Sequence, residues 1–336
     1  PWMRERMWEL RREKTDPTQP AWMIPPIAHI GHGPSGLAHY PGTGDSYPAN
    51  GSFLMADFPG GVRHIVVEPD GAWSRVASVE MAVSGKDVTD VSWGYDGRAY
   101  MSEWGGGWGP NENGYIFTMT NDVVHADPEQ AALIAEVKTL FAEGFEHRET
   151  EALVALLGHA DQRVRLHAQY ELAKREGVAG RIGTVAQNVN APLMQRIHAI
   201  WTVGMIAHRD ASATAMLDTL INDDDPDIST QATKTLGDLG WNATDQYIRL
   251  LRSGHGQARF YAAIALGRTD AAEAIPALGT QAFGNPAWRY GAAAITLFAI
   301  VLLRRILMRL MIRGLRQVTS RTKTTLDDQL VDALNP

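Results

Sequence analysis

The sequence has no cysteine among its 336 residues. This absence excludes disulfide bridges, thiolate zinc sites, iron–sulfur clusters and a cysteine nucleophile. It does not indicate a compartment, because a chain without cysteine is stable in oxidising and in reducing surroundings. The chain also lacks an excess of positive charge: its formal net charge is -7, so we predict no nucleic-acid partner. With 45% hydrophobic and 21% charged residues the composition is that of a folded chain, and the length suggests about two domains.

Positive charge is concentrated near the C-terminus. Residues 284–336 hold eight Arg and Lys against three Asp, a net charge of +5, which leaves -12 for the rest of the chain. The uncharged run 290–303 would measure about 21 Å as a helix, shorter than the ~30 Å core of a bilayer. The preceding Trp288 and the following arginines are typical of membrane segments. We predict a membrane or membrane-surface helix with a basic flank over 288–336, in contact with lipid through 288–316; a cap of the helical domain is the alternative.

The region 25–121 is rich in Gly, Pro and aromatic residues and predicts antiparallel sheet. Short alternating runs are separated by turns such as Asp-Gly, a pattern typical of hairpins. The runs that predict strands are 52–56, 64–68, 88–93, 99–102 and 115–119. About 97 residues suffice for one or two four-stranded propeller blades, or for part of a barrel.

A repeat of about 31 residues follows, over 146–283. An alanine recurs with an aliphatic residue four positions later and a small residue five positions later, at Ala168, Ala199, Ala232 and Ala262. Residues four apart share a helix face, and small residues let a neighbouring helix approach closely. The period and the paired amphipathic helices predict an α-solenoid, with an ordinary helical bundle as the alternative.

Two shorter segments complete the predicted organisation. Residues 1–24 form a leader or linker, and residues 122–145 form a connecting helix. Asp127 followed by Pro128 predicts where the main part of that helix begins. The chain starts at Pro1 without an initiator methionine or a signal peptide, and we expect a fragment of a longer protein.

Histidines are the first candidates for chemistry. Three of them, His29, His32 and His39, lie within eleven residues, but without HxH or HExxH spacing. Hydrogen-bonded structural histidines are therefore favoured, and no metal ligand is predicted. The Gly-rich stretch 103–110 matches no phosphate-binding pattern and is interpreted as an inter-strand loop. The acidic run 223–227 lacks the glycine and terminal glutamate of a calcium loop and is interpreted as a helix cap.

Three motifs resemble the last blades of glucose/sorbosone dehydrogenase-type β-propellers: 32–44 (HGPSGLAHYPGTG), 51–58 (GSFLMADF) and 96–104 (DGRAYMSEW). In the bacterial membrane-bound dehydrogenases of this kind the propeller precedes HEAT repeats, and 159–165 (HADQRVR) is similar to the first such repeat. The resemblance covers about residues 20–280. It implies a multidomain fold: a partial antiparallel β-propeller, then an α-solenoid of HEAT-like repeats and a C-terminal hydrophobic and basic helix.

The same resemblance implies a cofactor. Active relatives bind pyrroloquinoline quinone (PQQ) and calcium in the propeller, and a histidine of an earlier blade takes the substrate proton. His32 and Arg63 are the residues that we place near the cofactor, and no catalytic residue is assigned. The implied activity is PQQ-dependent oxidation of a sugar or alcohol by a membrane-associated protein of the bacterial periplasm or cell envelope. We expect this fragment alone to be inactive.

The C-terminus resembles a second family. Residues 321–331 (RTKTTLDDQLV), after an Arg-rich apolar helix, look like the N-terminal membrane segment of small-conductance mechanosensitive channels. Three functions therefore stay open. They are the C-terminal part of a quinoprotein-like dehydrogenase, a scaffold that binds a protein partner through the solenoid surface, and an extracytoplasmic sensor fused to a channel.

Overall fold

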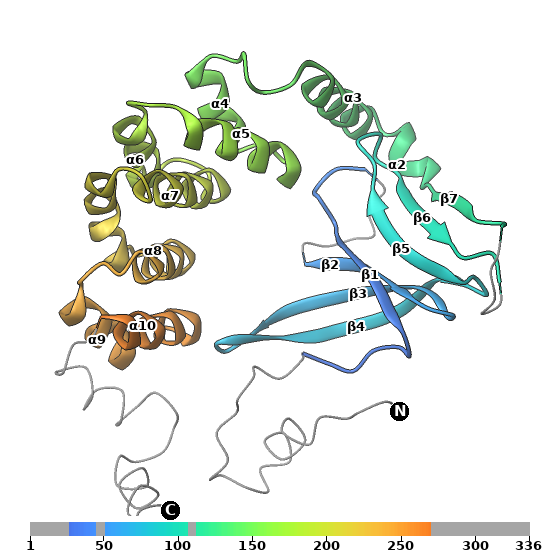
Figure 1. Cartoon of the computed structure of the whole chain (residues 1–336), viewed down its shortest axis with the longest axis horizontal. Coiled ribbons are helices and arrows are strands. Elements are labelled where there is room, and N and C mark those ends of the chain that lie inside the picture. The colour runs from blue at the N-terminus through green and yellow to red at the C-terminus, as the bar shows by residue number, and fades with distance from the viewer. Residues whose placement is uncertain (1–26, 45–50, 107–111, 270–336) are drawn as a thin grey trace, which may run out of the picture. The chain divides into compact units, whose positions relative to one another are not determined.

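The computed structural model describes residues 27–44, 51–106 and 112–269. In these ranges strands come first and helices follow, all within one compact unit (Figure 1). The predicted leader 1–24 and the predicted membrane helix over 288–336 lie outside the described residues. Within the part that is described, no helix is both long and apolar enough to cross a bilayer.

The strands form two antiparallel sheets in which each strand pairs with the next one along the chain. The first sheet contains β1 (Pro34–His39), β2 (Ser52–Asp57), β3 (Gly61–Asp70) and β4 (Trp73–Ser84). The second contains β5 (Val88–Trp93), β6 (Ala99–Glu103) and β7 (Tyr115–Met119). The predicted partial β-propeller is therefore wrong: the described residues form two small sheets of four and three strands, with no closed propeller among them.

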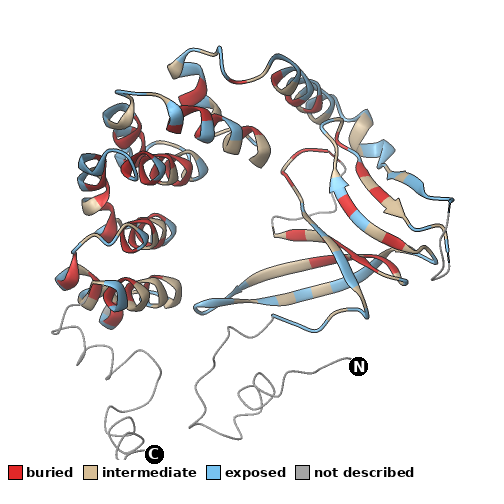
Figure 2. Ribbon diagram, viewed as in Figure 1, coloured by how far each residue is buried: buried red, intermediate tan, exposed pale blue. Residues whose placement is uncertain are grey.

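One apolar layer joins the two sheets, and Figure 2 shows it as buried segments on both. Its buried members are Leu54, Ala56, Val62, Val88, Val91, Ala99 and Met101. The layer forms because every second residue of a strand faces the same side of its sheet, and apolar residues occupy the positions that face the other sheet. The propeller prediction failed for a related reason. Alternation and turns specify which strands pair, but closure depends on contacts between strands far apart in the chain.

The connecting helix is present as two pieces, α2 (Asp122–Ala126) and α3 (Pro128–Glu143). The Asp127 carboxylate accepts hydrogen bonds from the backbone N–H groups of Glu129 and Gln130, at 3.0 and 2.9 Å. Pro128 occupies the first helical position, where its missing N–H costs nothing. The predicted start of this helix is confirmed.

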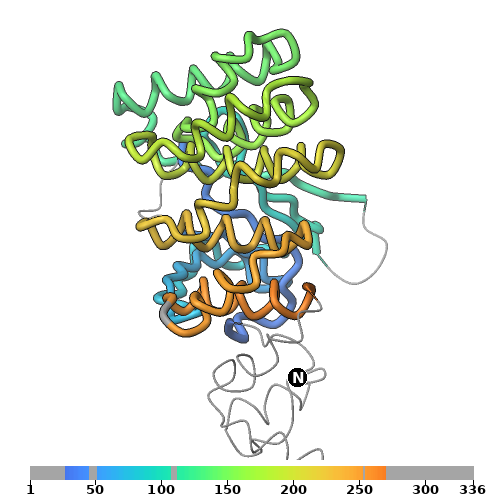
Figure 3. The backbone as a smooth tube through the Cα atoms, turned by 90° about the vertical axis from the view of Figure 1, so that its left-hand side faces the viewer, coloured from blue at the N-terminus to red at the C-terminus, as the bar shows by residue number. Residues whose placement is uncertain are grey.

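The remaining helices stack in chain order, as the green-to-orange tube of Figure 3 shows. They are α4 (Thr150–Leu156), α5 (Gln162–Lys174), α6 (Ala179–Gln187), α7 (Leu193–Ala207), the 3-10 helix η1 (Ala211–Asn222), α8 (Pro226–Asp238), α9 (Thr244–Ser253) and α10 (Gly256–Arg268). The four repeated alanines are all fully buried, on α5, α7, α8 and α10. The predicted close approach also occurs, because a Cβ built on Gly204 of α7 would lie 2.5 Å from the Thr235 methyl of α8.

Candidate functional site

The two residues predicted from the sequence, His32 and Arg63, meet at Asp57 on the last position of β2. The backbone N–H groups of His32 and Gly33 donate to Asp57 Oδ1 at 2.7 and 3.0 Å. Arg63 Nε donates to Asp57 Oδ2 at 2.8 Å. Asp57 itself is 1% exposed and was not singled out from the sequence. The structure therefore brings both predicted residues together, His32 through its backbone rather than its ring.

Asp57 is held as a carboxylate. Its burial raises the pKa, but the hydrogen bonds from Gly33, Arg63 and His32 and the guanidinium charge outweigh burial and lower the pKa below its usual value. The charge of Arg63 is thus paired within the chain, so its guanidinium is not a free cation for an anionic quinone. Among the described residues no group of three His, Asp or Glu side chains gathers to hold a metal. Binding of PQQ and calcium stays a prediction.

Two other candidates from the sequence have structural roles. His39 Nδ1 lies 3.0 Å from Gln162 Oε1, so this exposed histidine is hydrogen-bonded to the residue that begins α5. In the acidic run, Asp225 accepts hydrogen bonds from the first N–H groups of α8, and Asp223 pairs with Arg196 at 2.6 Å. The interpretation of this run as a helix cap is also confirmed.

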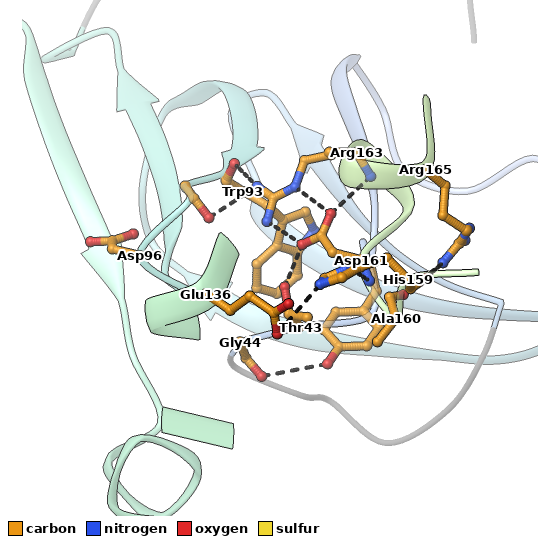
Figure 4. Close-up of polar contacts among 12 residues, drawn as sticks. Thr43, Gly44, Trp93, Asp96, Glu136, His159, Ala160, Asp161, Arg163 and Arg165 are labelled. Carbon is orange, nitrogen blue, oxygen red and sulfur yellow. Dashed lines mark hydrogen bonds and ion pairs between the residues drawn. The ribbon is translucent and has the colours of Figure 1, made fainter. Parts of the chain in front are cut away.

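A buried carboxylate joins the sheets to the helices (Figure 4). Asp161 precedes α5 and is fully buried. It accepts hydrogen bonds from the Thr43 hydroxyl, in the chain after β1, and from the Arg163 backbone N–H at 2.8 Å. Burial raises the pKa of Asp161, but the hydrogen bonds from Arg163 and Thr43 outweigh it and lower the pKa. An ionised side chain therefore holds two segments that are far apart in the sequence.

Arg163 extends this junction to the second sheet. Its Nη2 lies 2.7 Å from Asp161 Oδ2, and its Nη1 donates to the carbonyl oxygens of Trp93 and Gly94 at 2.9 and 3.0 Å. The guanidinium also lies over the Tyr95 ring, 5.0 Å from its centroid. Tyr95 opens the turn between β5 and β6, so one arginine fixes the position of that turn against α5.

A second polar chain runs from the junction into the helices. Arg165 donates through Nη1 to the carbonyl oxygens of His159 and Ala160 at 2.6 and 2.7 Å, and through Nε to His198 Nε2 at 3.1 Å. His198 Nδ1 lies 2.8 Å from Gln169 Oε1. Because Arg165 only donates, His198 accepts at Nε2 and carries its proton on Nδ1. Burial and then the Arg165 charge lower the pKa of His198 to about 4, so its ring is neutral.

The turn held by Arg163 supports a row of aromatic rings. Tyr95 stacks on Phe141 of α3 with centroids 3.9 Å apart. Phe141 in turn meets Phe145 at 5.4 Å and His167 of α5 at 4.9 Å, both edge to face. Edge-to-face rings at these separations attract one another beyond the area that they bury. The row therefore has a fixed geometry from the sheet to α5.

This row ends in an open groove of about 720 Å³ between the end of α3, α5 and the end of α7. Phe141, Phe145 and His167 line it with Tyr170 and Met205, which are 47% and 38% exposed. Two cations, Lys174 and Arg209, and two carboxylates, Glu146 and Glu171, complete the wall. Glu171 is already paired, with Lys174 at 3.2 Å and Arg175 at 3.5 Å. The groove combines a rigid aromatic floor with exposed apolar side chains, an arrangement suited to an apolar side chain of a ligand.

The sequence analysis missed this groove. The signal was present as two pairs of ring-bearing residues close in sequence, Phe141 with Phe145 and His167 with Tyr170. Only the second pair lies on one helix face, because α3 ends at Glu143 and Phe145 follows its Gly144 cap. The groove was missed because the two pairs are far apart in the chain, and only the packing of the end of α3 against α5 brings them together.

Comparison with known proteins adds no relative: no known family and no curated protein matches this sequence. The resemblances to dehydrogenases and to channels therefore stay predictions, and so does the location in the cell envelope.

Proposed function

We propose that the protein is an interaction scaffold, and that the groove between α3, α5 and α7 binds an apolar segment of a partner protein. The observation that supports this proposal is the pair of exposed apolar side chains, Tyr170 and Met205, beside a floor of packed rings. Tyrosine and other aromatic residues dominate the binding energy of many protein interfaces. Stacked helices that expose one surface are also a common framework for binding proteins.

The groove is prepared for a ligand in two respects. Phe145 is only 6% exposed, and its contacts with Phe141 and His167 hold the floor in place. A pre-formed floor lowers the entropy that a ligand loses on binding. Arg209 also stands at the wall, and its Nη2 donates to the carbonyl oxygen of Arg175 at 2.9 Å rather than to a carboxylate. An apolar anchor followed by an acidic residue therefore satisfies both parts of the site.

The test uses a displayed library of random peptides, selected on the full chain. We expect enrichment of peptides with an aromatic or aliphatic anchor next to an acidic residue. A selected peptide should bind the Tyr170→Ala variant at least about tenfold more weakly, as expected for a contact at the centre of an interface. Val189→Ala is the matched control, because Val189 is 73% exposed but lies away from the groove, after α6. Absence of enrichment, or equal binding to both variants, contradicts the proposal.

A further inference from the structure

The outer face of the four-stranded sheet, opposite the three-stranded sheet, is apolar along all four strands. The pairing of the strands shows which residues lie on this face, because directly paired residues project to the same side of a sheet. Leu37 is paired with Met55, Phe53 with Ile65, and Ile65 with Val79. By the same pairing the face holds the apolar side chains Leu37, Phe53, Met55, Ile65, Val67, Val76, Val79 and Met81. A half-covered antiparallel sheet normally alternates apolar and polar residues, with the polar ones facing solvent. In this sheet apolar residues lie on both faces, although the outer face also holds His39 on β1 and the paired Asp57 and Arg63 at one end. Met55 and Ile65 are buried, so the exposed part of the face is formed by its other apolar members.

The face contains both a hollow and a projection. The hollow is a groove of about 750 Å³, lined among others by Phe53, Ile65 and Val67. Leu37 stands at its wall and is 63% exposed, and Met81 on the opposite edge strand is 45% exposed. Patches of this kind on a soluble surface mark sites of association.

Charge does not oppose contact between two such faces. At one end of the face Arg63 is paired with the buried carboxylate of Asp57. The Arg75–Glu68 pair alternates with Val67 and Val76 and therefore belongs to the opposite side of the sheet. The charged end of the outer face is thus neutral by itself, and a second identical face brings no unpaired like charges together. This matters for an acidic chain, whose copies otherwise repel one another.

We propose that two copies of this chain pack through their outer faces and form a two-fold symmetric dimer. A two-fold symmetric contact uses the same surface patch on both partners. A patch that carries a projecting side chain, Leu37, beside a groove can therefore be complementary to a second copy of itself. Leu37 of each copy enters the groove of the other. Strand lengths and inter-strand spacings give the face a flat area of roughly 500 Å², without the additional surface of the protruding side chains. That is the same order as the roughly 800 Å² per partner of a standard interface.

Sedimentation equilibrium of the full chain tests the proposal. We expect a monomer–dimer equilibrium that Leu37→Glu weakens at least about thirtyfold, because the substitution places a charged side chain in the apolar groove of the other copy. Ile116→Glu on β7 is the matched control: Ile116 is 77% exposed but belongs to the other sheet, and its substitution should leave the equilibrium unchanged. Both positions are exposed, so neither change is expected to unfold the chain.

A second measurement locates the contact. Because the chain has no cysteine, one substitution creates one reactive thiol. Val79→Cys on the outer face should cross-link to a second copy with a short bismaleimide, and Ile116→Cys should not. A monomer at all concentrations overturns the proposal, as does equal weakening by both glutamate variants or cross-linking at Ile116 alone. An apolar small molecule extracted from the purified monomer also overturns it, because the groove then has a different occupant.

Discussion

At the scale of single residues, buried polar side chains decide how the two parts of the chain meet. Asp161 caps α5, because its carboxylate accepts the hydrogen bond of the Arg163 N–H. Its bond to the Thr43 hydroxyl could not be expected, because 118 positions separate the two residues. His198 gave no signal at all in the sequence. Its role depends on Arg165 and Gln169, which belong to another helix.

His198 should make the stability of the protein depend on pH. Its pKa is lowered by burial and by Arg165 to about 4, whereas a histidine in the unfolded chain titrates near 6.5. Between these values the unfolded chain binds a proton that the folded chain does not, so stability falls as pH falls. The expected loss between pH 7.5 and pH 5 is about 2 kcal/mol. Urea unfolding at the two pH values measures it.

The His198→Gln variant should lose this part of the pH dependence, because glutamine does not titrate. His208→Gln is the control, since His208 is exposed at the end of α7 and its replacement should leave the pH dependence as it is. An unchanged pH dependence in His198→Gln would show that another group is responsible.

At the scale of elements, the helical repeat was predictable and the sheets were predictable in part. Leu172, Val203, Leu236 and Leu266 follow the repeated alanines by four positions, and all are at most 2% exposed. Strands β1 and β4 were not among the predicted strands. Alanine and serine dilute the β-prone residues of β4, so the extended form of that segment depends on its pairing with β3.

The small residues of the repeat should differ in their tolerance of an added methyl group. A Cβ at Gly204 would lie 2.5 Å from the Thr235 methyl, whereas a Cβ at Gly267 has nothing within 4 Å. We expect Gly204→Ala to lower the free energy of unfolding by about 1–3 kcal/mol, because α7 and α8 must move apart. Gly267→Ala should raise it by up to about 1 kcal/mol through helix propensity. Urea unfolding of both variants measures the contrast, and equal effects would mean that α7 and α8 are not in close contact.

At the scale of the whole described chain, the order of the parts was predictable and their contact was not. Gly97 in the turn between β5 and β6 illustrates the point. Its φ of +81° suits glycine, and a Cβ there would lie 2.8 Å from Ile134 of α3. The Asp-Gly pair predicted a turn but gave no sign that a helix packs on it.

Arg163 should control how firmly this turn is attached. Lysine cannot replace it, because an ammonium group lacks the planar fork that reaches a carboxylate and two carbonyl groups together. In Arg163→Lys we expect the Gly94 amide of the turn to exchange its hydrogen at least about tenfold faster through local opening. Amides of α8 and α10 should be unaffected. Hydrogen exchange read by mass spectrometry or NMR measures both.

Arg268→Lys is the matched control for this experiment, because Arg268 also pairs with an aspartate, Asp238, but at an exposed position of α10. It should leave exchange in the turn unchanged. Unchanged exchange in Arg163→Lys would mean that the packing of Tyr95 and Gly97 on α3 holds the turn without the arginine.

Local sequence patterns were sufficient to predict the strand-then-helix order, the start of α3, the buried stripe of the repeat and the capping aspartates. These features depend on periodicity and on neighbours within a few positions, which a sequence displays directly. Packing in the folded chain was needed to fix the number and closure of the sheets, the Asp57 and Asp161 junctions, the aromatic groove and the outer face of the first sheet. Each of these joins residues tens of positions apart. Such contacts follow from how whole elements pack, and a local pattern does not contain that information.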